Sequence, residues 1–305
     1  MDRRATLCLL PLVIAVFLAG LVCGCGVDAP EEDIIEEHEP GTVRVPGDRA
    51  TVTGALLAAH PGDTVLVASG TYEESGLFMM PGVLLRSKTL VAADVVIDGR
   101  GQGIVLICSN LDDAVRIEGI TFTGGAGDQA GGVFIDSTRV TMTGCVIEGN
   151  VGVSAAGGLR CSGESELTLI DCIIRNNQVD AYRGGGLWCG EFARVVLENC
   201  WFTKNSALIG GGLWCGGGAE ITMTSCRLDS NQAVMHGGGI CLEGYGIFTG
   251  VESSFQHNSA PEAADGMFDP DLAGEGFPAT LRCCQIDLDH WLGWRRLVID
   301  DDDCR

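Results

Sequence analysis

The feature that most limits the possible folds of this chain is an internal repeat of about 27 residues. Five copies of a Gly-Gly-apolar step begin at Gly131, Gly157, Gly185, Gly211 and Gly238, spaced by 26, 28, 26 and 27 residues. Each copy closes on an asparagine, and these asparagines are Asn150, Asn177, Asn205, Asn231 and Asn258. Such a period is typical of solenoids, in which a repeat buries its apolar face by stacking on its neighbours.

Within each copy, apolar and polar residues alternate, which is the period of a β-strand and excludes helices. The segments RVTMT (139–143), ELTLI (166–170), RVVLE (194–198) and EITMT (220–224) align in one register. We predict three inward columns of stacked apolar side chains. The columns are Val140, Leu167, Val195 and Ile221; Met142, Leu169, Leu197 and Met223; and Ile147, Ile174, Phe202, Leu228 and Phe255.

The recurring glycines and asparagines are assigned to the corners of the coils. Gly-Gly runs permit positive φ and a close approach of the backbone to its neighbours. We expect the five asparagines to occupy the next corner in the left-handed region and to form a hydrogen-bonded ladder from coil to coil. Their predicted role is structural, and no catalytic residue is predicted among them.

Fifteen cysteines in an exported chain would suggest disulfides, but most fall in two inward columns. These columns are Cys145, Cys172, Cys200 and Cys226, and Cys161, Cys189 and Cys215. The parallel Cβ vectors of stacked residues disfavour the disulfide torsion, so we predict reduced, buried thiols. No histidine converges on either column, and no metal site is predicted. Cys283, Cys284 and Cys304 lie outside the repeats, where one bridge would fit.

These motifs resemble two groups of known proteins. The Gly-Gly-apolar step with Phe202-x-x-Asn205 and Phe255-x-x-Asn258 resembles the repeats of chlamydial polymorphic outer membrane proteins. The segments GDTVLVASGTYEE (62–74) and VVIDGRGQG (95–103) are similar to the opening coils of right-handed β-helix proteins of the pectin-lyase-like superfamily.

Over residues 42–262 this resemblance implies an all-β fold, a right-handed parallel β-helix (solenoid) of about eight coils. In the superfamily, a short helix that resembles Thr51 to His60 plugs the first coil. Beyond Asn258 the repeat fades, and residues 263–305, with a strand-like RRLVID segment, are expected to form a C-terminal cap.

The N-terminus has the layout of a signal peptide, because Arg3 and Arg4 precede an apolar stretch that is too short to be a membrane span. The segment VCGC (22–25) resembles the lipobox of bacterial lipoproteins, which makes Cys25 the expected lipidation site. We expect residues 1–24 to be a lipoprotein-type signal peptide and residues 25–41 an acidic tether. The alternative is cleavage by ordinary signal peptidase and secretion.

This layout predicts an exported protein, either an outer-membrane or cell-surface lipoprotein held by its lipid anchor only, or a secreted one. The 41 acidic residues outnumber the 19 basic residues and give a net charge of −22. A strongly acidic chain argues against nucleic acid as a partner. We expect a monomer whose partner is a polysaccharide or a cell-surface glycan.

Outward positions decide function, because inward positions only pack. Arg139, Glu166, Arg194 and Glu220 alternate in charge along one outward column and are predicted to form cross-strand ion pairs. A second outward column follows the Gly-Gly steps and contains Phe134, Arg160, Trp188 and Trp214. Aromatic faces and an arginine in line could stack on sugar rings, which makes these four the candidate glycan-binding residues. The alternative is that a loop covers them or that they stiffen the sheet.

The resemblance also implies an enzyme hypothesis, since the superfamily contains lyases that use Ca²⁺ with an arginine base and hydrolases that use clustered aspartates. Their motifs are absent here, and no catalytic residue is predicted. Asp300 to Asp303 could bind Ca²⁺ loosely, and no other cofactor is expected. The leading hypothesis is a non-enzymatic β-helix for adhesion or glycan binding; the alternative is a polysaccharide lyase or glycoside hydrolase. Three acids and a basic residue on one outward face would favour the enzyme.

Overall fold

The computed structural model describes residues 39–261, 266–268, 279–285, 291–292 and 297–300. The chain divides into two units, Met1–Glu37 and His38–Arg305, and all described residues belong to the second. The predicted signal peptide, Cys25 and most of the predicted tether therefore lie outside the described residues, as do Asp301 to Asp303. No helix in the described part of the chain combines the length and apolar character needed to cross a membrane.

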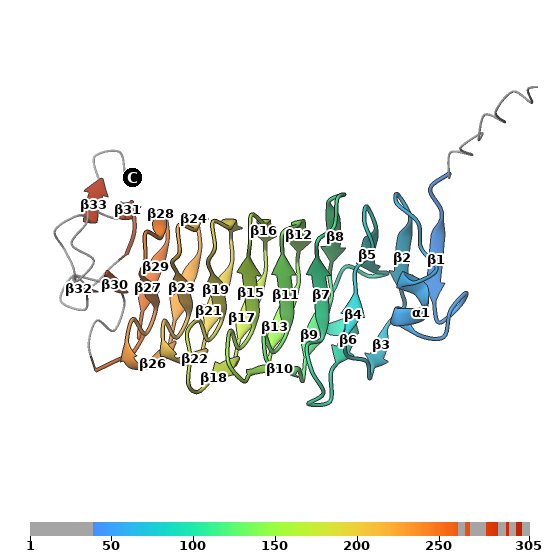
Figure 1. Cartoon of the computed structure of the whole chain (residues 1–305), viewed down its shortest axis with the longest axis horizontal. Helices are drawn as coiled ribbons and strands as arrows, with labels where there is room; N and C mark the ends of the chain where they lie inside the picture. Colours follow the sequence, from blue (N-terminus) through green and yellow to red (C-terminus); the bar gives the residue numbers. More distant parts are fainter. Residues whose placement is uncertain (1–38, 262–265, 269–278, 286–290, 293–296, 301–305) are drawn as a thin grey trace, which may run out of the picture. The chain divides into compact units, whose positions relative to one another are not determined.

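The second unit is a parallel β-helix in which each strand pairs in parallel with its counterpart one coil further along the chain (Figure 1). An eleven-stranded sheet contains β1 (Thr42–Val45), β2 (Thr64–Val67), β5 (Leu84–Ser87), β8 (Val115–Glu118), β12 (Arg139–Thr143), β16 (Glu166–Ile170), β20 (Arg194–Glu198), β24 (Glu220–Thr224), β28 (Ile247–Val251), β31 (Ala279–Arg282) and β33 (Leu297–Asp300). A nine-stranded sheet contains β4 (Leu77–Phe78), β7 (Leu106–Ser109), β11 (Val133–Asp136), β15 (Leu159–Ser162), β19 (Leu187–Cys189), β23 (Leu213–Cys215), β27 (Ile240–Leu242), β30 (Gly266–Phe268) and β32 (Trp291–Leu292).

Two further sheets complete the coils. An eight-stranded sheet contains β3 (Gly70–Tyr72), β6 (Val95–Asp98), β9 (Thr121–Thr123), β13 (Val146–Glu148), β17 (Ile173–Arg175), β21 (Trp201–Thr203), β25 (Arg227–Asp229) and β29 (Ser254–Gln256). A five-stranded sheet contains β10 (Ala126–Gly127), β14 (Val151–Gly152), β18 (Gln178–Val179), β22 (Ser206–Ile209) and β26 (Gln232–His236). The eight strands of the former agree with the predicted number of about eight coils.

Among the described residues there is one short α-helix, α1 (Val52–Leu56), which lies against β1, β2 and β4 at the start of the solenoid. The Thr51 hydroxyl accepts a hydrogen bond from the Gly54 amide at 3.0 Å, and the Glu74 carboxylate accepts from the Val52 and Thr53 amides at 2.8 and 2.9 Å. These bonds satisfy donors that every helix N-terminus leaves unpaired. The predicted capping helix is confirmed, and Val52 and Leu56 are among its residues that cover the first core layer. A 3₁₀ turn, η1 (Ala92–Asp94), precedes β6.

The three predicted inward columns are buried and lie in one continuous apolar cluster from Val45 to Leu281. The predicted strand register is also observed, because Val140 pairs with Leu167, and Leu167 with Val195. Burial of like residues above one another removes the apolar face of every coil from water, which is the main stabilising contribution in such a solenoid.

The five asparagines form the predicted ladder, and every amide group in its interior is satisfied. In each step the Nδ2 of one asparagine donates to the Oδ1 of the next at 3.0 Å, from Asn150 through to Asn258. The same Oδ1 accepts from the backbone N–H of the preceding asparagine, and Nδ2 also donates to a carbonyl, as Asn205 does to Ile174 at 2.9 Å. A fully bonded buried amide stabilises, whereas an unpaired one is costly.

One part of the corner prediction is wrong, because the ladder asparagines are not in the left-handed region. The residue before each of them has positive φ instead. These residues are Gly149, Asn176, Lys204, Ser230 and His257, with φ between 53° and 59° at the four non-glycine residues and 63° at Gly149. The left-handed residue turns the chain so that the asparagine side chain enters the core, where it can reach the next coil.

The Gly-Gly steps are needed for the close approach of one coil to the next. A Cβ added to Gly186 would lie 2.5 Å from the carbonyl oxygen of Gly212 and 3.0 Å from Nδ2 of Asn205. In the Gly-Gly-Gly runs 184–186, 210–212 and 237–239, only the first glycine has positive φ, as at Gly184 with 73°. Glycines and asparagines therefore recur together because the missing side chain of one leaves space for the amide of the other.

The described cysteines of the repeats are thiols, as predicted, and both inward columns are buried. Burial raises the pKa of Cys161 to about 12 and also raises that of Cys108. A thiolate is the reactive form of cysteine, so these side chains behave as small apolar residues. At the other end, Cys283 is disulfide-bonded and Cys284 carries a thiol.

The segment expected to cap the solenoid contributes strands that continue its sheets. β30 pairs in parallel with β27, and β31 with β28. The strand-like RRLVID segment contains β33, which pairs with β31. The described strands of residues 263–305 thus add to the open edge of the preceding coil, which protects its backbone groups from pairing with another chain.

The ladder predicts a large effect for a single substitution. Asn205→Ala should lower the free energy of unfolding by at least about 3 kcal/mol, because donors and acceptors on two neighbouring coils lose their partners in the core. Asn176→Gly, at the exposed position that precedes the ladder residue Asn177 and has a φ of 53°, should change it by less than about 0.5 kcal/mol. Denaturant unfolding followed by circular dichroism measures both, and equal effects would contradict the ladder's role.

The buried thiols predict a loss of stability in alkali. A thiol whose pKa is raised by folding keeps its proton longer in the folded chain, so its contribution is complete below the unfolded value near 9 and is lost as the pH rises toward 12. We expect the free energy of unfolding to fall by about 1 kcal/mol per pH unit for each such thiol in this window. Cys161→Ala should reduce the slope. Native protein should resist alkylation at these thiols until denaturant is added.

Candidate functional site

The outward column that the sequence singles out lies on the nine-stranded sheet in the predicted register. Phe134 pairs with Arg160, Arg160 with Trp188, and Trp188 with Trp214, on β11, β15, β19 and β23. Trp188 and Trp214 lie outside the main core and belong to a second apolar cluster, together with Ile209 of β22. The column therefore faces away from the core, as predicted.

The tryptophans of this column are covered, however. Trp188 is 6% exposed and Trp214 is 8% exposed, and their rings stack with centroids 5.0 Å apart. The guanidinium of Arg160 lies 4.6 Å from the centre of a Trp188 ring, and Ile209 packs in the same cluster. Trp188 and Trp214 therefore do not offer open faces to sugar rings; the burial agrees with the alternative stated above, in which a neighbouring segment covers them.

Phe134 and Arg160 are also engaged. Phe134 is half-buried, and the Arg160 guanidinium lies 5.7 Å from its ring centre. Arg160 donates a hydrogen bond to Gln129 and forms an ion pair with Glu191 at 3.5 Å. The structure thus brings the four predicted residues together as a packed cation–aromatic column that ties turns to the sheet, not as a bare binding strip.

An open groove lies on the outer side of the eight-stranded sheet. It has a volume of about 420 Å³, within the range of small-ligand sites. Its central aromatic residue is Trp201 of β21, 38% exposed, while strand alternation turns the next residue, Phe202, into the core. The lining residues are Arg175, Asn176, Trp201, Thr203, Lys204, Arg227, Asp229 and Ser230.

This groove is locally basic, although the whole chain carries a net charge of −22. The three cationic side chains that line it are Arg175, Lys204 and Arg227. Arg175 pairs with Glu148, and Arg227 pairs with Asp229 at 3.0 Å. Within the described part of the chain, Lys204 has no ion-pair partner. The groove therefore keeps one uncompensated positive charge beside its aromatic face.

The local backbone explains how these groups are positioned. Lys204 occupies the left-handed corner before the ladder residue Asn205, with φ of 55°, and is exposed. The Arg227 guanidinium lies 5.5 Å from the Trp201 ring centre, one coil further on. Its partner Asp229 is only 8% exposed and also contacts Nδ1 of His257 at 2.8 Å. The asparagine ladder therefore fixes the backbone at Lys204, and the buried carboxylate of Asp229 holds the guanidinium of Arg227.

This groove was not predicted from the sequence, because the residues that define the repeat motif are buried ones. Phe202 and Asn205 define the recurring motif, and Trp201 and Lys204 stand directly before them. The strand register was available from the sequence, and it places Trp201 beside Ile173 and Arg227 in one outward column. Reading that column as well as the one after the Gly-Gly steps would have found the site.

A second pocket, of about 330 Å³, contains three acids and a basic residue, the combination stated above to favour an enzyme. Its charged lining residues are Asp112, Glu164, Glu166 and Arg139. Arg139 and Glu166 form the predicted cross-strand ion pair at 2.8 Å and are both well exposed. The three carboxylates do not converge as a cation-binding group among the described residues. The pocket is charged, but its charged side chains are exposed to solvent.

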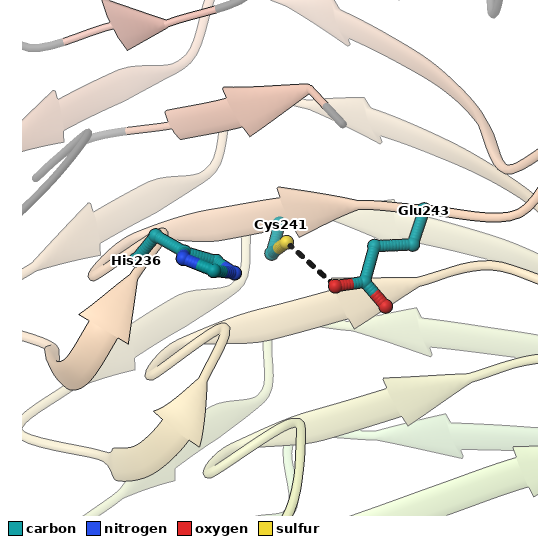
Figure 2. Close-up of side chains that lie close together, drawn as sticks. All are labelled: His236, Cys241 and Glu243. Atoms are coloured by element: carbon teal, nitrogen blue, oxygen red, sulfur yellow. Dashed lines mark hydrogen bonds between the residues drawn. The ribbon is translucent and has the colours of Figure 1, made fainter. Parts of the chain in front are cut away.

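A third group, absent from the sequence-based candidates, is a cluster of metal-ligating side chains. His236, Cys241 and Glu243 come from the end of β26, from β27 and from just after it, and Figure 2 shows them pointing toward one another. Their ligand atoms all lie within 4.8 Å of one another. No metal site was predicted from the sequence, on the ground that no histidine converges on the inward cysteine columns. Cys241 pairs with Trp214 and so lies in the outward column instead.

With the geometry in view, comparison with known proteins decides the family. A family model described as a right handed beta helix region matches residues 81–263. The chain belongs to this family. The match confirms the right-handed parallel β-helix that the repeats and the opening coils imply. No curated protein matches the sequence of this β-helix protein.

Solved structures resemble this β-helix protein at low sequence identity. A pectin methylesterase from Aspergillus niger is 12% identical, with 87% of this chain and 88% of that chain covered and a TM-score of 0.50. Pectate lyase Pel9A is 11% identical, with 88% and 82% covered and a TM-score of 0.49. An alginate lyase from Paenibacillus sp. str. FPU-7 is 15% identical, with 86% and 99% covered and a TM-score of 0.46. The likeness to the pectin methylesterase extends to the fold alone.

The covered column of this β-helix protein predicts a stability defect for Trp188→Ala. Loss of a buried, stacked indole should lower the free energy of unfolding by about 3–5 kcal/mol. Trp201→Ala, which removes a partly exposed indole, should cost less than about 1 kcal/mol. Denaturant unfolding of the two variants side by side tests this difference. A Trp188→Ala protein as stable as the parent would show that the column is open after all.

Proposed function

We propose that this β-helix protein binds an acidic polysaccharide, without cleaving it, through the groove around Trp201. The observation that carries the proposal is a partly exposed tryptophan flanked by three cations on a strongly acidic chain. The fold is shared with a pectin methylesterase, and we extend the likeness from fold to ligand class only as part of this proposal.

Shape and surface character support a sugar as the ligand. An indole face offers a flat apolar area on which a pyranose ring can stack, and Trp201 stands on a strand whose two neighbours hold it in register. The side chain loses little conformational freedom on binding, because strands β17 and β25 restrict it. Asn176, Thr203 and Ser230 supply hydrogen-bonding groups along the same groove.

Charge supports an acidic sugar over a neutral one. Lys204 has no carboxylate partner among the described residues, and Arg175 and Arg227 present the remaining donors of their guanidinium groups. Arginine binds carboxylates through paired N–H donors, and lysine does so as a point charge. A uronate residue stacked on Trp201 would bring its carboxylate within reach of this set. The rest of the acidic surface repels polyanions and confines binding to the groove.

The location of the protein is part of the same proposal. The signal-peptide layout, the lipobox-like VCGC segment with Cys25 and the acidic tether support export and attachment by a lipid anchor, with secretion as the alternative. The resemblance of the repeats to those of chlamydial polymorphic outer membrane proteins favours a surface role in adhesion. We propose a monomer that presents its groove outside the cell.

A second candidate function, a polysaccharide lyase or glycoside hydrolase, rests on the pocket lined by Asp112, Glu164, Glu166 and Arg139. We rank it lower because these carboxylates are exposed and Arg139 is engaged with Glu166. General acid–base chemistry needs carboxyl groups whose environments differ, and burial usually provides that difference.

Binding to polygalacturonate or alginate tests the proposal. Isothermal titration of the purified protein should show binding that weakens as salt is raised, because exposed charges are screened. Trp201→Ala should reduce affinity at least about tenfold, which corresponds to about 1.4 kcal/mol for the lost aromatic platform. Lys204→Asn, which suits the left-handed backbone, should reduce affinity for the polyuronates and leave any binding of neutral glycans unchanged.

The controls separate the groove from the rest of the surface. Phe78→Ala removes another exposed aromatic residue, on β4, and should leave affinity unchanged. The same mixtures are assayed for new reducing ends and for unsaturated products. Binding of the polysaccharide without cleavage supports the proposal, whereas cleavage that is lost in Arg139→Ala would favour the second candidate. Affinity unaffected by Trp201→Ala would remove the groove as the binding site.

A further inference from the structure

We propose that His236, Cys241 and Glu243 form a zinc site on the outer side of the nine-stranded sheet. This site is separate from the Trp201 groove, which lies on the eight-stranded sheet, and it does not depend on the polysaccharide proposal. Sulfur, imidazole nitrogen and carboxylate oxygen are the ligand types that Zn²⁺ takes in proteins. Three protein ligands leave at least one coordination position for water or for a bound group.

The repeat itself provides an internal comparison for these three positions. In the preceding coil, the residues in register with His236 and Cys241 are Ile209 and Trp214. The position that corresponds to Glu243 is Gly216, which follows Cys215 as Glu243 follows Leu242. One coil thus replaces an isoleucine, a tryptophan and a glycine with three metal-ligating residues at once. Packing alone does not require this change, since the preceding coil packs without it.

The backbone brings the three side chains together. Cys241 and Glu243 are two residues apart around the end of β27, so they lie on the same side of the strand. His236 ends β26, and the chain then turns sharply at Gly237, where φ is 68°. A Cβ on Gly237 would lie 2.8 Å from the Cβ of Cys241. The glycine is what permits the segment that carries His236 to approach Cys241.

The carboxylate is held with one oxygen toward the cluster. Oε2 of Glu243 accepts hydrogen bonds from Nε of Arg183 at 2.9 Å and from Nε1 of Trp214 at 3.1 Å. The other oxygen, Oε1, lies 3.9 Å from Sγ of Cys241, the contact drawn as a dashed line in Figure 2. Such outer hydrogen bonds orient the ligands of protein metal sites and raise affinity. Here one donor, Trp214, belongs to the cation–aromatic column described above, and the other is Arg183.

Distances and burial fit a single ion. Zinc lies about 2.3 Å from sulfur and about 2.0–2.2 Å from nitrogen or oxygen, so small side-chain rotations bring ligand atoms within 4.8 Å of one another onto one ion. Cys241 is fully buried, whereas His236 and Glu243 are half-buried and provide the path for entry. On binding, the Cys241 thiol releases its proton to solvent and the thiolate sulfur bonds the ion, without any change of oxidation state.

Metal titration of the chelator-treated full chain tests the site. We expect one Zn²⁺ or Co²⁺ per chain by elemental analysis, a rise in Tm with added Zn²⁺, and a thiolate-to-cobalt charge-transfer band with Co²⁺. Cys241→Ser should abolish that band. Glu243→Gln, which keeps an acceptor for Arg183 and Trp214, and His236→Ile, which restores the residue of the preceding coil, should each weaken binding at least tenfold.

The controls keep the test decisive if one variant folds poorly. Cys284→Ser removes a half-buried thiol elsewhere and should leave stoichiometry and the cobalt band unchanged. Circular dichroism checks that each variant keeps the β-helix, and the partly exposed positions 236 and 243 provide variants that do not disturb the core. Absence of binding by the parent chain, or an unchanged cobalt band in Cys241→Ser, would overturn the zinc site. Neither result bears on polysaccharide binding at Trp201.

Discussion

Parallel stacking of coils in register is the constraint on which the rest of this molecule depends. A parallel sheet pairs each strand with a partner about 27 residues away, so the backbone hydrogen bonds of a coil form only with a neighbouring coil that is stacked in register. The corner where polar groups enter the core is the critical point. There, an interior ladder asparagine such as Asn205 uses both Nδ2 donors and both acceptor positions of its Oδ1 within the protein. The ladder thus fixes the register of one coil on the next and avoids a buried unsatisfied amide.

Much of the fold is predictable from the sequence, because the physical requirements recur at every coil. The inward columns, the strand register and the reduced thiols follow from strand alternation and from the geometry of stacked cysteines. The conformation of the asparagine corner was less predictable. Propensity assigns positive φ to Asn itself, but Asn205 must direct its amide into the core, so the turn falls on Lys204. The demand for hydrogen bonds between coils overrides the local preference.

The sites were harder to predict than the fold, because exposure depends on segments that the repeat does not specify. Trp188 and Trp201 both face away from the core, and alternation alone treats them alike. The structure separates them, since Ile209 and Arg160 cover Trp188 while the Trp201 side chain borders a groove. His236 and Glu243 come together with Cys241 through a turn at Gly237. Strand register predicts which residues share a column, but it does not predict contacts that a turn between two strands creates. Low-identity structural neighbours share the scaffold and leave both questions open.

The left-handed corner has a consequence for how this surface can diversify. The backbone conformation at this position is imposed by the asparagine that follows it, and the side chain points away from the core. Gly149, Asn176, Lys204, Ser230 and His257 fill it in successive coils and have no chemistry in common. The solenoid therefore carries a row of substitutable display positions, one per coil and each next to its most rigid point. Exchange of a single residue in this row would retune the charge of the Trp201 groove at little cost to folding.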